Sequence, residues 1–108
     1  MSYSVLAVPK FKKELKKLIK KYPSLKDEFA SLINNLEKNP EQGKSLGMNC
    51  YKIRLAIKSK GKGKSGGSRV ITNILIEDRI VYLLSIYDKS DKENLTNKEL
   101  LELLKSLE

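Results

Sequence analysis

Residues 51–58 read YKIRLAIK, and this alternation of apolar and basic side chains decides the class of fold. The side chains on one side of an extended chain would be Tyr51, Ile53, Leu55 and Ile57, and those on the other Lys52, Arg54, Ala56 and Lys58. A period of two is typical of a half-buried β-strand. The segment therefore predicts a strand with one apolar face and one basic face.

Downstream of this strand the sequence predicts a hairpin and a helix. Residues 69–76 and 79–87 are apolar and β-branched, and Glu77 and Asp78 separate them, as in two antiparallel strands joined by a tight turn. Residues 96–99 read TNKE, in which Thr96 and Glu99 have the spacing of a capping box. The leucine-rich residues that follow predict a C-terminal helix.

Upstream of the strand, a short β-prone run at residues 4–8 is followed by two helical patterns. Their apolar positions recur at helical spacing: Phe11, Leu15, Leu18, Ile19 and Tyr22 in the first, and Leu25, Phe29, Leu32, Ile33 and Leu36 in the second. Only Pro23 and Ser24 separate the two patterns, and Ser24 is suited to cap the second helix. The short connection predicts an antiparallel helical hairpin. Residues 39–49 are then expected to be a loop.

These elements give an α+β fold with the order β-α-α-β-β-β-α. We expect an antiparallel sheet packed against the N-terminal helical hairpin and the C-terminal helix. A chain of 108 residues is sufficient for one such core, so residues 1–108 are expected to be a single domain.

The composition excludes several kinds of site. Cys50 is the only cysteine and the chain has no histidine, so an internal disulfide and a zinc site of Cys and His ligands are both excluded. The carboxylates do not cluster as in a two-metal nuclease, and we expect neither a metal nor another cofactor. A reducing, cytoplasmic setting fits best, and no segment has the length of a membrane span.

The positive charge is concentrated in one stretch. Residues 42–76 contain eight basic side chains and no Asp or Glu, against a formal net charge of +9 for the whole chain. These basic residues are Lys44, Lys52, Arg54, Lys58, Lys60, Lys62, Lys64 and Arg69. A cationic segment on an otherwise balanced chain indicates a polyanionic partner, most often nucleic acid.

Three strings of sequence resemble a known group of proteins. They are CYKIRL at residues 50–55, GSRVI at residues 67–71 and LLSIYDK at residues 83–89. Together with the order of elements, they are similar to the RelE/ParE superfamily of bacterial toxins. The glycine- and lysine-rich residues 58–69 most resemble the HigB-like branch.

The resemblance implies the toxin of a type II toxin–antitoxin pair. Such a toxin cleaves messenger RNA in the decoding site of the ribosome and is silenced by a neighbouring antitoxin protein. By matching positions, Lys52, Arg54 and Arg69 would contact phosphate and take part in catalysis, and Lys89 falls where RelE enzymes place a catalytic arginine. Leu95 stands near the place of their general base, a tyrosine, so that role would have to move, with Tyr87 as the candidate.

The residue types fit metal-independent RNA cleavage. Without histidine, proton transfer and charge stabilisation are left to lysine, arginine and tyrosine, and the ribosome would orient the substrate. Four lysines are expected to grip the phosphates of ribosomal RNA: Lys58, Lys60, Lys62 and Lys64.

A purely structural or solubilising role remains an alternative for each of these residues. Lys52 and Arg54 would simply solubilise the exposed face of a sheet, Arg69 would pair with a neighbouring strand, and Tyr87 would be a core residue. The lysine-rich loop would be a solvated segment, as would the lysines of the first helix. Two other functions also remain: a ParE-like inhibitor of DNA gyrase on the same fold, and an RNA-binding relative without catalysis.

Overall fold

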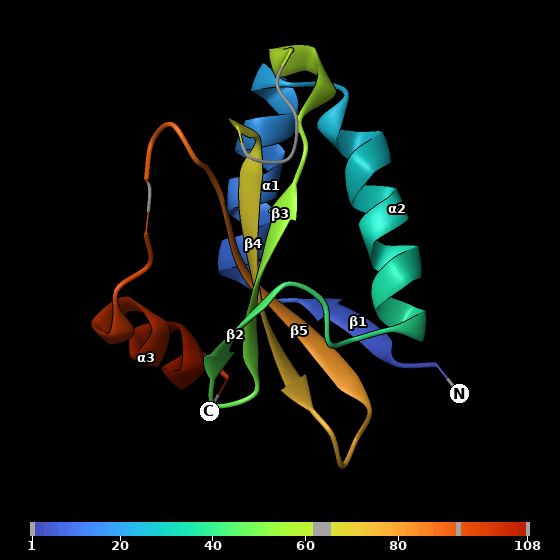
Figure 1. Cartoon of the computed structure of the whole chain (residues 1–108), viewed down its shortest axis with the longest axis vertical. Helices are drawn as coiled ribbons and strands as arrows, with labels where there is room; N and C mark the ends of the chain where they lie inside the picture. The colour runs from blue at the N-terminus through green and yellow to red at the C-terminus, as the bar shows by residue number, and fades with distance from the viewer. Residues whose placement is uncertain (1, 62–65, 93, 108) are drawn as a thin grey trace.

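One sheet of five strands organises the molecule, in the order β1-β5-β4-β3-β2 (Figure 1). The computed structural model describes residues 2–61, 66–92 and 94–107. The strands are β1 (Ser4–Ala7), β2 (Lys44–Gly47), β3 (Cys50–Leu55), β4 (Ser68–Leu75) and β5 (Ile80–Asp88). The long central strands β4 and β5 form the predicted hairpin, with Leu75 opposite Ile80 beside the turn.

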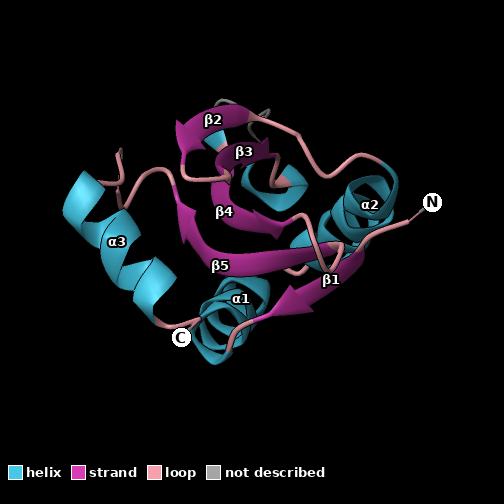
Figure 2. Ribbon diagram, turned by 90° about the horizontal axis from the view of Figure 1, so that it is seen from below, coloured by secondary structure: helices cyan, strands magenta, loops and turns pink. Residues whose placement is uncertain are grey.

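Three α-helices surround this sheet. They are α1 (Pro9–Lys21), α2 (Leu25–Lys38) and α3 (Asn97–Lys105), and a short 3-10 helix, η1 (Lys58–Lys60), follows β3. In Figure 2, α2 and α3 lie on opposite sides of the sheet, while α1 lies along its β5–β1 end. The α+β class and the order of the predicted elements are therefore confirmed.

Part of the apolar core lies between α2 and one face of the sheet. Ile53, Val70 and Ile86 are partners in register across β3, β4 and β5, and all three side chains are buried. Leu32 and Leu36 of α2 belong to the same apolar cluster. The predicted alternation is thus confirmed within Cys50–Leu55, where Ile53 is buried and Arg54 is exposed, whereas Lys58, expected to continue the basic face, begins η1 instead.

The two N-terminal helices do not form a single layer on one side of the sheet, as a simple hairpin would. They flank the β1–β5 end of the sheet from two sides and meet through the rings of Phe11 and Phe29, whose centroids are 5.7 Å apart. Ser24 stands at the predicted cap position of α2 but makes no capping hydrogen bond, because its side chain contacts Ser59 and Glu28 instead. The capping box of Thr96 and Glu99 at α3 is present as predicted.

Two features of the sheet were not predicted. Strand β1 runs parallel to β5, so the sheet is mixed rather than wholly antiparallel. The expected loop at residues 39–49 contains β2, which pairs with β3 through a turn at Met48 and Asn49. Both turn residues have positive φ (54° and 59°), as in the tight turns that join antiparallel strands. The sequence did not predict this turn, because Met48 stands at a position where Gly is common.

No helix in the described ranges has the length and apolar character needed to cross a membrane.

Candidate functional site

The basic side chains of the sheet share one face. Arg54 lies opposite Arg69, and Arg69 lies opposite Tyr87, so these three residues form a row across β3, β4 and β5. Lys52 lies opposite Lys44 of β2 in a neighbouring row. Directly opposed residues in antiparallel strands project to the same side and have Cβ atoms about 5 Å apart. The sheet therefore collects cations from three strands, β2, β3 and β4, on one face.

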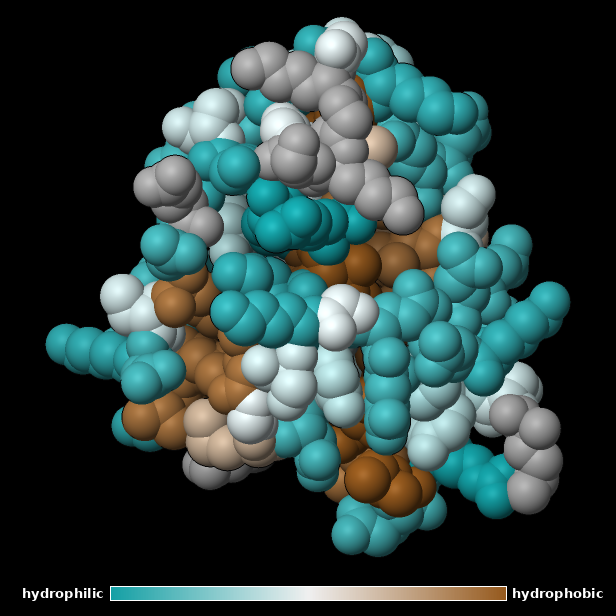
Figure 3. All heavy atoms as spheres, viewed as in Figure 1, coloured by the Kyte–Doolittle hydropathy of each residue, from teal (hydrophilic) through white to brown (hydrophobic). Residues whose placement is uncertain are grey.

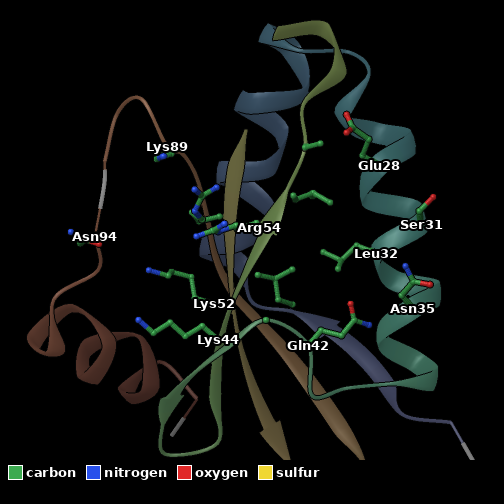
Figure 4. A pocket seen from close by; sticks show the side chains of 15 residues that line it. Glu28, Ser31, Leu32, Asn35, Gln42, Lys44, Lys52, Arg54, Lys89 and Asn94 are labelled. Carbon is green, nitrogen blue, oxygen red and sulfur yellow. The ribbon is translucent and has the colours of Figure 1, made fainter. Parts of the chain in front are cut away.

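This face opens into a cleft with a volume of about 840 Å³. Its cationic wall consists of Lys44, Lys52, Arg54, Arg69 and Lys89. The cleft continues over the edge of β3 to α2, where its polar lining is Glu28, Ser31, Asn35 and Gln42 (Figure 4). Between β3 and α2, Figure 3 shows apolar surface surrounded by hydrophilic side chains.

The cationic side chains of the cleft differ in their exposure to solvent and in their hydrogen bonds. Arg54 is exposed, Lys52 and Lys89 are half-buried, and Arg69 is buried with 4% of its surface accessible. The Nη1 of Arg69 donates to the carbonyl oxygen of Ser68 at 3.1 Å. A guanidinium fixed in this way is pre-organised for a bidentate phosphate contact. Arg54 and Lys52 keep the freedom to adjust to a ligand.

The cleft has little negative charge to neutralise these cations. Glu28 is the one acid among its described lining residues. Its Oε1 accepts hydrogen bonds from the backbone N–H of Lys58 at 3.0 Å and from the hydroxyl of Ser24 at 3.3 Å. Four of the five predicted catalytic residues, namely Lys52, Arg54, Arg69 and Lys89, therefore line one open, cationic cleft.

Tyr87 lies beside the cleft rather than in its lining. It borders a smaller cavity of about 210 Å³ between α1, β5 and α3, which Leu95 also lines. Its hydroxyl is buried and has no hydrogen-bond partner among the described residues. Burial raises the pKa of Tyr87, and the positive charge of Arg69 opposes that rise. The phenol is therefore protonated at neutral pH, which suits a proton donor better than a base.

The lysines predicted to grip RNA have different surroundings. Lys58 is exposed at the start of η1. The Nζ of Lys60 instead forms a 2.7 Å ion pair with Oδ1 of Asp88, and only 11% of the Lys60 side chain is accessible. This contact uses the ammonium inside the fold, so Lys60 is not presented for binding phosphate. Lys62 and Lys64 lie outside the described residues.

Several residues of the site were not predicted. Lys44 belongs to the acid-free stretch, but its role could not be assigned without β2, which brings it opposite Lys52. Asn94 and the polar side chains of α2 line the cleft without any recognisable motif. Asp88, which supports the end of β5 behind the site, was also not predicted. Its position at the end of an apolar strand, between Tyr87 and Lys89, was the available signal.

The donor set of the described residues does not fit a bound metal. They contain no group of three or more His, Cys, Asp and Glu side chains that could hold an ion. The chemistry of the cleft is instead that of lysine and arginine, which bind and stabilise oxyanions.

The comparisons with known proteins agree with this arrangement. The model of the family described as "RelE toxin of RelE / RelB toxin-antitoxin system" matches residues 10–107. The chain belongs to the RelE toxin family. It is thus a toxin of a toxin–antitoxin system, as the resemblance implied. The narrower assignment to the HigB-like branch stays a prediction.

Solved structures of RelE toxins share the fold of this RelE-family protein. A double arginine-to-alanine mutant of the Escherichia coli toxin RelE in the free state is 20% identical, with a TM-score of 0.63 over 100% of both chains. The isolated E. coli RelE toxin is 19% identical, with a TM-score of 0.59 over 99% of this chain and 100% of that chain. The RelBE2 toxin–antitoxin complex from Mycobacterium tuberculosis contains a chain that is 17% identical, with a TM-score of 0.55 over 82% of this chain and 99% of that chain. At these identities the structures support the fold alone.

Proposed function

We propose that this RelE-family toxin is a ribosome-dependent endoribonuclease that cleaves messenger RNA during translation without a metal. One observation carries the proposal: Lys52, Arg54, Arg69 and Lys89 line a single cleft in which the one acidic lining residue is already engaged by Lys58 and Ser24. A cationic cleft open to solvent fits an RNA strand better than it fits a small neutral ligand.

Cleavage by the 2′-hydroxyl of RNA develops negative charge on the phosphate that is attacked. Arg69 is the fixed donor for that charge, and Arg54, opposite it in register, is the adjustable one. Lys52 and Lys89 supply further charge and are candidates for protonating the leaving 5′-oxygen. The 2′-hydroxyl must also lose its proton, and the ribosome would hold the RNA in the geometry for this step.

Tyr87 is the remaining proton-transfer candidate. It is adjacent to Arg69 in register, but its protonated hydroxyl is buried and the residue borders the smaller cavity rather than the cleft. We propose that it acts, if at all, as a proton donor rather than as the base. Lys58 is proposed to contact ribosomal RNA from the rim of the cleft, because it is exposed at the start of η1.

The proposed partners follow from the same surface. The RelBE2 structure holds a toxin with its antitoxin. We propose that an antitoxin with an acidic segment covers the cationic cleft of this toxin in the cytoplasm. Co-expression with the protein encoded by the adjoining gene tests this proposal, since the two should copurify and reversal of Arg54 to Glu should weaken the complex.

The direct test is a translating extract supplied with the purified toxin, with messenger ends mapped by primer extension. We expect cuts within ribosome-bound codons and none in the same RNA without ribosomes. Arg54→Ala should lower the cleavage rate about 100-fold, the order of loss on removing one transition-state donor. Lys12→Ala is the matched control, since it removes an equally exposed cation that does not line the cleft.

Other outcomes would select the alternative functions. Ribosome binding with intact messenger would identify an RNA-binding relative without catalysis. Intact messenger together with inhibited supercoiling by purified DNA gyrase would identify the ParE-like function. Either result would reject the proposed nuclease.

A further inference from the structure

The side chain of Asp88, at the end of β5, is buried and hydrogen-bonded outside the cationic wall of the cleft. That side chain has 0% accessible surface, and Lys60 Nζ is 2.7 Å from Oδ1. Oδ1 also accepts hydrogen bonds from the backbone N–H of Ser90 at 2.9 Å and from its hydroxyl at 2.7 Å. The hydroxyl of Tyr22 donates to Oδ2 at 3.2 Å. Both carboxylate oxygens therefore have partners, as a buried charge requires.

The carboxylate of Asp88 lies on the opposite face of the sheet from the cationic wall of the cleft. Asp88 is in register with Ser68, whereas its neighbour Tyr87 is in register with Arg69 on the cationic face. Because side chains alternate along a strand, Asp88 anchors the end of β5 from behind. It does so without placing negative charge beside Arg69, and its own charge is balanced by Lys60.

The partner cation belongs to a segment that is itself held in place. The backbone N–H of Ser59 donates to the hydroxyl of Ser24 at 2.9 Å, and the backbone N–H of Lys58 donates to Glu28 at 3.0 Å. These bonds attach η1 to the start of α2. The Lys60 ammonium then joins η1 to the end of β5, and it stands 5.8 Å from the centre of the Tyr22 ring.

The strand end that this network fixes carries residues of the proposed site. Lys89 directly follows Asp88, and its backbone N–H donates to the carbonyl oxygen of Gly67 at 3.0 Å. Gly67 lies two residues before Arg69. The bond therefore sets where the Lys89 side chain leaves the sheet relative to the Arg69 guanidinium.

We infer that Lys60 and Asp88 are positioning residues, forming a buried clamp that fixes Lys89 and Tyr87 against Arg69 for the reaction. The inference rests on the proposed nuclease function. It replaces the RNA-gripping role predicted for Lys60, and it explains how one lysine of the basic stretch can matter without touching the substrate.

Loss of the clamp should slow catalysis without weakening the binding of RNA. The loss leaves Lys52 and Arg54 free to hold the RNA but lets the Lys89 segment move from its place. A displacement of about 1 Å in a reacting geometry costs on the order of 100-fold in rate. A lysine that bound phosphate would instead contribute to affinity, and its loss would reduce the salt dependence of binding by about one counterion.

The test uses the paired variant Lys60→Met/Asp88→Asn. Removing only one partner would leave an unpaired buried charge, whereas neutralising both keeps the volume and should leave a folded protein. Lys10→Met is the matched control, because it breaks the exposed 2.8 Å ion pair with Glu14. Tyr22→Phe removes one donor to Asp88 and retains the ring, and it supplies a milder variant that does not alter either charge.

Three quantities are measured: hydrogen exchange of the Lys89 amide, affinity for ribosomes, and the single-turnover cleavage rate. For the paired variant we expect Lys89 exchange at least about tenfold faster than in the wild type, affinity within about twofold, and cleavage slower by about 10- to 100-fold. Tyr22→Phe should show the same changes to a smaller degree, and Lys10→Met should show none.

The inference is overturned if Lys89 exchanges at the wild-type rate in both the paired variant and Tyr22→Phe. It is also overturned if ribosome affinity and its salt dependence fall while the cleavage rate of bound complexes is kept, which would identify Lys60 as an RNA ligand. A wild-type protein that cuts no RNA refutes the proposed function separately, because the exchange of Lys89 is measured without any substrate.

Discussion

Replacement of Gly67 by alanine should damage the molecule at the point where β4 begins. A Cβ at this position would lie 2.4 Å from the carbonyl oxygen of Leu55 and 2.9 Å from the Cα of Ala56 and the backbone nitrogen of Ile57. All three atoms belong to the backbone, so no change of rotamer relieves the contact. The neighbouring segment would have to move by about 1 Å to restore ordinary van der Waals separation.

The cost of that movement follows from the bonds around Gly67. Its carbonyl oxygen accepts from the Lys89 amide at 3.0 Å, and the next hydroxyl, that of Ser68, donates to Leu55 at 3.0 Å. Weakening two bonds of buried groups, each worth about 1 to 2 kcal/mol, together with overpacking of similar size, gives a loss of about 3 kcal/mol in the free energy of unfolding. Lys89 would also lose its fixed position, so cleavage should fall as well.

Gly61→Ala separates this steric cost from the conformational cost of replacing a glycine. Gly61 has a φ of +72° and open space around its Cβ position, so its replacement should cost only about 1 kcal/mol. Urea unfolding followed by far-UV circular dichroism gives both values at neutral pH. If Gly67→Ala were no more destabilising than Gly61→Ala, the argument from close approach of β3 and β4 would be refuted.

Three further predictions concern single side chains. Tyr87→Phe should leave the free energy of unfolding unchanged or raise it by up to about 1 kcal/mol, because the lost hydroxyl is buried without a partner among the described residues. Clear destabilisation would contradict this expectation. Slower cleavage by the same variant would show that the hydroxyl donates a proton. Burial alone would raise the pKa of Asp88, but hydrogen bonds from Lys60 and Ser90 hold that pKa well below its usual value. The stabilisation from ionised Asp88 is therefore complete above about pH 5 and is lost as the pH falls through the lowered pKa. The stability advantage of the wild type over Asp88→Asn, measured by urea unfolding from pH 7 to pH 2, should shrink with acid rather than grow. Thr96→Ala removes the N-cap of α3 and should cost about 1 kcal/mol, with faster amide exchange confined to that helix; an equal effect on α2 would mean that the change is not local.

The sequence was sufficient for the elements whose signals are local. The alternation of β3, the hairpin of β4 and β5, and the capping box of α3 each depend on neighbouring residues, and each was predicted correctly. Strand β1 depends on β5, more than 70 positions away, and nothing in a four-residue run says which neighbour it joins or in which direction. Strand β2 was not predicted, because its sequence signal is equally short and its turn has Met48 in place of glycine.

The residues of the candidate site divide in the same way between local and long-range signals. Strand periodicity predicted that Lys52 and Arg54 share one face, whereas Arg69 and Lys89 were assigned to the site through the family resemblance. The burial of Lys60 depends on a carboxylate 28 residues away and on the docking of η1 against α2, which no periodicity encodes. Tyr87 was placed on the correct strand, but only the folded structure shows that its hydroxyl is buried and that the residue borders a separate cavity beside α3.

The parallel pairing of β1 with β5 has a consequence for synthesis of the chain. Strand β1 is made first but obtains its partner only when residues 80–83 have been made. The cleft likewise stays incomplete until residues 87–89 have been made, since Arg69 is in register with Tyr87 and Lys89 supplies part of the cationic wall. An unfinished polypeptide lacks both the sheet edge and the assembled cleft. The order of strands thus delays assembly of the cleft until β5 and Lys89 have been made.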